Sequence, residues 1–169
     1  MKVLTTYYSE TGNTEEVARA IHDAVDVHDK TLLPISQVDD ASGYDLVFCG
    51  FPVQTHGVPV AVHHFIKELP PGMSLALFAT HGVPRGGELA KTAMIHAVSL
   101  AAKQKVVRTF ACRGRVHPSV VEALKNQPEH GPWAEIANGA AKHPDENDLA
   151  DAAAFAESVV ATSLHHQAK

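Results

Sequence analysis

Short apolar runs alternate along the chain with segments whose apolar residues recur every three or four positions. The apolar runs predict strands, and the recurring spacing predicts amphipathic helices. Strands are expected at 3–8, 31–35, 45–50, 74–79 and 105–112. Helices are expected at 15–25, 59–69, 88–102 and 145–164. The run 45–50 is almost entirely apolar, which is typical of a parallel strand covered on both faces.

Strictly alternating strands and helices indicate an α/β fold with right-handed crossovers between parallel strands. Five strands suit a parallel sheet in the order 2-1-3-4-5 with helices on both faces, a three-layer sandwich. Proteins of this type bind ligands at the carboxyl ends of the strands, around the switch point between the first and third strands. We expect a single domain over 1–169, with an irregular insertion at about 113–144 that proline and glycine break into short pieces.

Composition narrows the classes of function and location. The chain of 169 residues carries a net charge of −5, which argues against a nucleic-acid-binding protein with its basic face. Cys49 and Cys112 form no CxxC pair and are expected to be buried, reduced thiols. No apolar run is long enough to span a membrane, and the start of the chain lacks the apolar region of a signal peptide. A cytoplasmic location is therefore expected.

The loop after the first predicted strand is suited to hold a phosphate. Ser9, Thr11 and Thr14 supply hydroxyls, Gly12 has no side chain, and a helix begins directly afterwards. The start of a helix presents unpaired backbone N–H groups and the positive end of the helix dipole. The loop lacks the lysine with which P-loops bind nucleoside triphosphates, so it suits a single phosphate monoester better than a triphosphate. A helix cap rich in Ser and Thr is the alternative.

Three stretches together resemble the flavodoxin family. The first loop resembles the flavodoxin signature Ser/Thr-x-Thr-Gly-x-Thr. The stretch Tyr-Asp-Leu-Val-Phe-Cys-Gly-Phe-Pro-Val resembles the third strand of flavodoxins, and Ala-Leu-Phe-Ala-Thr-His-Gly resembles their fourth strand. The resemblance implies the flavodoxin-like fold and an FMN cofactor held by three loops. The residues implied for the phosphate-binding loop are Ser9, Glu10, Thr11, Gly12, Asn13 and Thr14. Those implied around the flavin ring are Pro52, Val53, Gln54, Thr55, His56, Gly57, Thr80, His81, Gly82, Val83, Arg85, Gly86 and Gly87.

Flavodoxins often stack a Trp and a Tyr on the flavin ring, and this chain departs from that pattern. Its single Trp133 lies far along the chain, which leaves Val53, His56 or Val58 beside the ring. The peptide before Gly57 can flip at little steric cost and turn its carbonyl toward the one-electron-reduced flavin. A turn glycine without that role is the alternative.

The resemblance also makes three charge predictions. Arg85, without acids nearby, implies a less negative potential for full reduction of the flavin than in acid-lined flavodoxins, unless it is only solvated. His56 and His81 are candidate proton donors to reduced flavin or substrate. Arg113, Arg115 and His117 are candidates for a substrate carboxylate, a nicotinamide cofactor's phosphate or a partner, or they are solvated charges. The histidines show no metal-ligand spacing, so no metal is expected.

Two functions follow for a flavoprotein of this kind. The first is electron transport between redox partners. The second is an FMN-dependent NAD(P)H or quinone oxidoreductase acting on a small electron acceptor, since missing aromatic stackers leave the ring open. A response regulator on the same fold is a weak third reading, because it needs an Asp where Gly50 or Phe51 stands. No membrane or nucleic-acid partner is expected.

Overall fold

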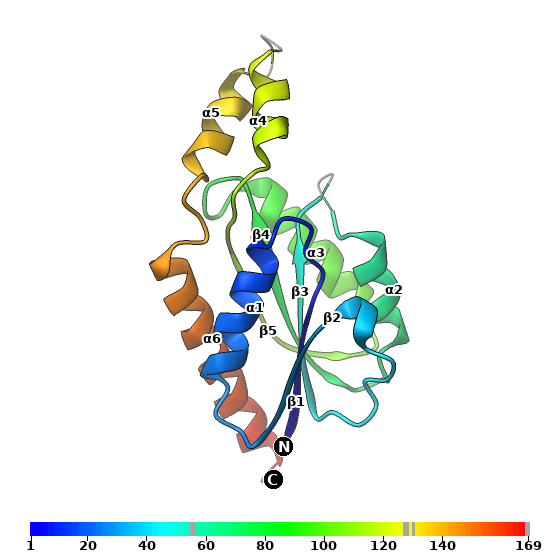
Figure 1. The fold of residues 1–169 in the computed structure, drawn as a ribbon. Helices are drawn as coiled ribbons and strands as arrows, with labels where there is room; N and C mark the ends of the chain where they lie inside the picture. The colour runs from blue at the N-terminus through cyan, green and yellow to red at the C-terminus, as the bar shows by residue number, and fades with distance from the viewer. Residues whose placement is uncertain (55–56, 127–128, 130, 168–169) are drawn as a thin grey trace.

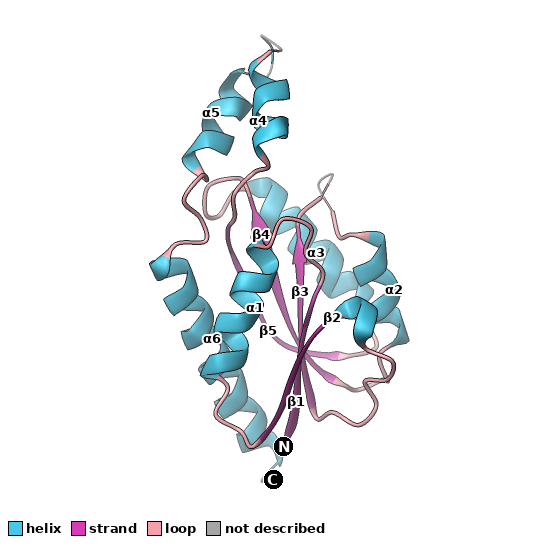
Figure 2. Ribbon diagram, in the orientation of Figure 1, coloured by secondary structure: helices cyan, strands magenta, loops and turns pink. Residues whose placement is uncertain are grey.

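The structure is a computed structural model that describes residues 1–54, 57–126, 129 and 131–167. Its centre is a five-stranded sheet in which every pair of neighbouring strands is parallel, in the order β2-β1-β3-β4-β5 (Figure 2). The strands are β1 Lys2–Tyr7, β2 Asp29–Pro34, β3 Leu46–Pro52, β4 Ser74–His81 and β5 Lys105–Arg113. The predicted strand order is confirmed. Strands β3 and β4 run two residues further than expected, so Pro52 and His81 are strand residues.

Helices cover both faces of the sheet, as predicted (Figure 1). One face carries α1 Asn13–Ala24 and α6 Glu146–Gln167, and the other carries α2 Val60–Glu68 and α3 Glu88–Leu100. Successive side chains of a strand point to opposite faces. Accordingly Val3 packs in the core beneath α1 and α6, while its neighbour Leu4 packs beneath α2 and α3. A short 3-10 turn, η1 Ile35–Gln37, follows β2.

The expectation of an irregular segment between β5 and the last helix is wrong. Two helices form there, α4 Pro118–Lys125 and α5 Gly131–Gly139. The described prolines and glycines of these two helices lie at or next to a helix end: Pro118, Gly131, Pro132 and Gly139. Pro118 is the first residue of α4, where its missing N–H costs nothing, and Pro132 lies in the first turn of α5.

The two short helices form an arm that projects beyond the carboxyl edge of the sheet (Figure 1). The N-terminus and the end of α6 lie at the opposite edge. The arm therefore stands beside the end of the sheet at which parallel α/β proteins bind ligands. Within the described part of the chain, no helix is long and apolar enough to cross a membrane.

Candidate functional site

An open cavity of about 230 Å³ lies at the carboxyl ends of the strands. Four segments line it: the loop after β1, the ends of β3 and β4 with the residues that follow them, and the segment after β5. Its predicted residues are Ser9, Glu10, Thr11, Asn13, Thr14, Pro52, Val53, Gln54, Thr80, His81 and Gly82. Its further residues are Gly114, Arg115, Val116, His117 and Val120. The structure thus brings the three predicted loops together around one space.

The loop after β1 presents the start of α1 to this cavity. Gly12 adopts a left-handed conformation with φ of 86°, and its N–H donates to the Ser9 hydroxyl at 3.1 Å. Among the described residues, no side chain caps the helix that begins at Asn13. The first N–H groups of a helix have no partner inside it, and they attract an anion. The arrangement suits a phosphate group.

Two polar side chains fix this loop to its surroundings. The Thr14 and Thr80 hydroxyls lie 2.9 Å apart in the interior and connect the start of α1 to the end of β4. The Asn13 side-chain amide donates to Thr11 Oγ1 at 3.1 Å and to the Arg115 carbonyl at 2.8 Å. Asn13 therefore holds the loop against the segment after β5.

His81 is buried at the end of β4, and its hydrogen bonding fixes the state of the ring. Its Nδ1 lies 2.9 Å from the Val83 carbonyl, which can only accept, so Nδ1 carries a proton. Burial lowers the pKa of His81, although the Val83 carbonyl opposes this shift. In the neutral ring Nε2 is then an acceptor, so the expected proton donor is better suited to receive a hydrogen bond.

Arg85 does not line the cavity, and acids neutralise its charge. Its guanidinium lies 2.7 Å from Asp148 and 2.7 Å from Asp151, both on α6. The sequence-based expectation of a loop without nearby acids is wrong, because these acids lie 63 or more residues further along the chain. The predicted effect of Arg85 on the flavin potential loses its basis.

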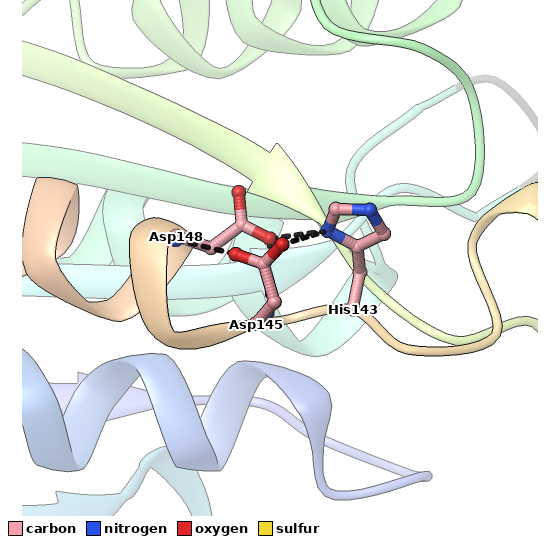
Figure 3. A group of neighbouring side chains, drawn as sticks. All are labelled: His143, Asp145 and Asp148. Carbon is pink, nitrogen blue, oxygen red and sulfur yellow. Dashed lines mark hydrogen bonds and ion pairs between the residues drawn. The ribbon is translucent and has the colours of Figure 1, made fainter.

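Asp148 is the centre of this junction (Figure 3). Its buried carboxylate accepts from Arg85 and, at 2.5 Å, from His143 Nδ1. Ligand atoms of His143, Asp145 and Asp148 lie within 4.8 Å of one another, as in a cation site. The guanidinium and the imidazole already satisfy Asp148, so we interpret the group as a structural connection between α6, the loop after β4 and the base of the arm.

Other predicted positions lie away from the cavity or outside the description. Those not among its lining residues are Gly12, Gly57, Val83, Arg85, Gly86 and Gly87. Thr55 and His56 lie outside the described residues. The Gly57 N–H donates to the Gln54 carbonyl at 2.8 Å, and the Gly57 carbonyl accepts from Gln54 N–H at 3.2 Å. The role of the preceding peptide in the redox chemistry stays a prediction.

The sequence named Arg115 and His117 as candidate binding residues, and both line the cavity, but it did not predict that the segment after β5 forms a whole wall. Its close fit depends on two glycines. A Cβ atom at Gly82 would lie 2.5 Å from Val116 Cγ2, and one at Gly114 would lie 3.0 Å from Asn13 Nδ2. Gly114, directly after β5, was the signal from which the sequence could have predicted this wall. The carboxyl ends of parallel strands meet at the same edge of a sheet, so the segment after β5 is expected near the other loops.

Comparisons with known proteins show the family and the fold of this chain. A sequence model of the Flavodoxin domain matches residues 4–157. This chain belongs to the flavodoxin family. The flavodoxin-like domain-containing protein BilS of Clostridioides difficile (strain CD3) is 27% identical over 172 residues, which cover 95% of this chain and 97% of that protein.

Solved structures show the same fold. Oxidised flavodoxin 2 from Bacillus cereus aligns with a TM-score of 0.68 and 18% identity over 96% of this chain and 99% of that one. The flavodoxin, WrbA-like protein from Agrobacterium tumefaciens aligns with a TM-score of 0.64 and 15% identity over 98% of both chains.

FMN is the cofactor of this flavodoxin, and the residues present fit it. The uncapped start of α1 and the hydroxyls of Ser9 and Thr11 suit the phosphate. The ends of β3 and β4 offer Val53 and Gly82 beside the space for the ring. Bound there, FMN supplies the electron-transfer chemistry, while the protein orients it and sets its environment.

The left-handed conformation of Gly12 makes a testable prediction. Gly12→Ala is expected to destabilise the protein by about 1–2 kcal/mol, because a Cβ atom strains a left-handed residue. The loss comes from the backbone alone, since nothing lies within 4 Å of the added atom. Urea denaturation measures it. Gly43→Ala is the matched control, with equally open space and no left-handed φ. Equal losses in both variants would contradict the prediction.

Proposed function

We propose that this flavodoxin carries electrons between redox partners through bound FMN. The observation that carries the proposal is the state of the arginines near the cavity. Arg85 is held by two acids of α6, and Arg115 pairs with Glu16 at 3.1 Å. The third arginine, Arg113, donates to the Gly82 and Ile136 carbonyls, so described residues already engage each of these arginines before the phosphates of a nicotinamide dinucleotide could bind. An electron carrier needs no such second nucleotide.

An FMN-dependent oxidoreductase that acts on a quinone or another small acceptor is the second candidate. The described residues that line the cavity include no Trp, Tyr or Phe, so no described aromatic ring there would cover the flavin. Trp133 lies on α5 with 43% of its surface exposed. An uncovered ring is accessible to a small substrate.

The compartment proposed for this function is the cytoplasm. Cys49 and Cys112 are free and buried, which fits a reducing environment. The redox partners proposed for this function are proteins or small molecules that exchange electrons with FMN.

Anaerobic reduction of the FMN-loaded protein separates the two functions. We expect light-driven reduction to accumulate the one-electron-reduced flavin, seen in the visible spectrum, and NADH or NADPH to leave the oxidised flavin unchanged for many minutes. Rapid bleaching by NADH or NADPH would favour the oxidoreductase. Failure of the apo-protein to bind FMN would overturn both.

A further inference from the structure

The phosphate end of the cavity lacks positive charge on its own loop. The loop after β1 contains the acid Glu10 and no basic residue. The Tyr8 hydroxyl donates to Glu10 at 2.5 Å and lowers the pKa of that carboxyl, so Glu10 is ionised near neutral pH. A phosphate placed here meets hydroxyls and the start of α1, but also this negative charge. Positive charge or hydrogen-bond donors that offset the charge of Glu10 have to come from another segment.

The segment after β5 brings two basic residues to this place. It is held against the loop by the bond from Asn13 to the Arg115 carbonyl and by the close approach of Gly114 to Asn13. From the other side, Arg115 N–H donates to the His143 carbonyl at 2.8 Å. Arg115 therefore has a fixed backbone, while 43% of its side chain is exposed.

His117 presents a defined hydrogen-bond donor. It stands before α4, and its carbonyl accepts from Val120 N–H at 2.9 Å. Ser119 N–H points to His117 Nδ1 at 3.3 Å. Nδ1 also lies 2.7 Å from the Ser119 hydroxyl, which can donate as well, so both contacts are satisfied when Nδ1 accepts and the ring proton lies on Nε2. In that tautomer Nε2 carries the ring N–H, which can donate to an anion.

Both side chains share their space with the phosphate loop. Arg115 and His117 line the main cavity, and they also line an adjoining hollow of about 540 Å³. Glu10 and Thr11 belong to both spaces as well. One anion near Thr11 can thus be reached from the loop and from the segment after β5.

We infer that Arg115 and His117 form a second wall of the phosphate site and bind the FMN phosphate together with the loop after β1. This inference rests on the proposed use of FMN. It assigns a part in cofactor binding to the residues between β5 and α4. It also explains how the loop after β1, which contains Glu10 and no lysine, retains a phosphate. The Arg115 guanidinium also donates to Glu16, which partly neutralises its charge. The phosphate site therefore needs both Arg115 and His117.

Paired titrations of the apo-protein with FMN and riboflavin test the inference, because riboflavin lacks only the phosphate. His117→Ala and Arg115→Gln are each expected to weaken FMN binding about five- to tenfold and to leave riboflavin binding unchanged. Glu16→Gln is expected to tighten FMN binding about twofold, since it frees Arg115. The loss in Arg115→Gln shrinks as salt is added, because salt screens the attraction between the guanidinium and the phosphate. His28→Ala is the control, an exposed histidine just before β2 at the opposite edge of the sheet.

The outcomes are distinguishable. Losses confined to FMN support the inference. Equal losses for FMN and riboflavin, or no loss, overturn it, and retained riboflavin binding shows that the variants are folded. If the wild-type protein binds neither flavin, the cofactor assignment itself fails together with the inference.

Discussion

A Gly50→Ala variant is expected to lose about 3 kcal/mol of stability. Gly50 lies in the central strand β3, directly beside Phe78 in the register of β4. A Cβ atom at position 50 would lie 2.1 Å from Cε2 and from Cζ of the Phe78 ring. Phe78 is fully buried, so its ring can move away only by displacing neighbouring core residues. The strain must spread through the centre of the sheet.

Urea denaturation measures this loss, and a double variant tests its cause. Phe78→Leu removes the ring and is itself destabilising. In that background, Gly50→Ala is expected to cost at least 1 kcal/mol less than in the wild-type protein, because residues in contact do not act additively. An unchanged cost would show that the ring is not the source of the strain.

Asp148→Asn is expected to destabilise the protein by about 2–3 kcal/mol. Only 1% of the Asp148 side chain is exposed, and removing one partner of a buried ion pair is costly because the other charge loses its compensation. Half-exposed Arg85 keeps Asp151 as a partner, which limits the loss. The bond from His143 and the bond from Asp145 N–H at 3.1 Å are weakened as well. Unfolding in urea at pH 7 measures the loss, and Asp151→Asn, which removes the half-exposed partner, is the control.

The Asp148 carboxyl also predicts how the stability of the protein changes with pH in acid. Burial of Asp148 opposes ionisation, but hydrogen bonds from His143 and Arg85 outweigh it and lower the pKa. A lowered folded-state pKa adds stability above the unfolded value, near 4, and this stability is lost as the pH falls through the folded value. From about pH 5 to about pH 2, Asp148→Asn should therefore lose less stability than wild type. Parallel pH profiles would contradict this.

The strand order, both layers of helices and much of the cavity were predictable from the sequence, because they depend on local patterns. Apolar runs locate the strands, and a parallel topology brings the loops after β1, β3 and β4 to one edge. The hydroxyls and Gly12 of the first loop carry their signal within six residues.

The remaining features depend on long-range contacts or on whether a single proline begins a helix or lies in a loop. The neutralisation of Arg85 by Asp148 joins residues that no local pattern connects. Pro118 opens a helix, although its sequence context also fits a loop. The wall from Gly114 to His117 forms because Asn13 contacts a segment about a hundred residues away.

The positions of the two buried cysteines show whether the polypeptide can store electrons in addition to the flavin. Cys49 lies in β3 and Cys112 in β5, with β4 between them, so about 10 Å separates the two strands. A disulfide requires Cα atoms within about 7 Å, and the chain contains no other cysteine. Burial also raises the pKa of each thiol to about 12, which leaves almost no reactive thiolate at neutral pH. The polypeptide therefore adds no dithiol couple, and the redox capacity of the loaded protein is that of its flavin.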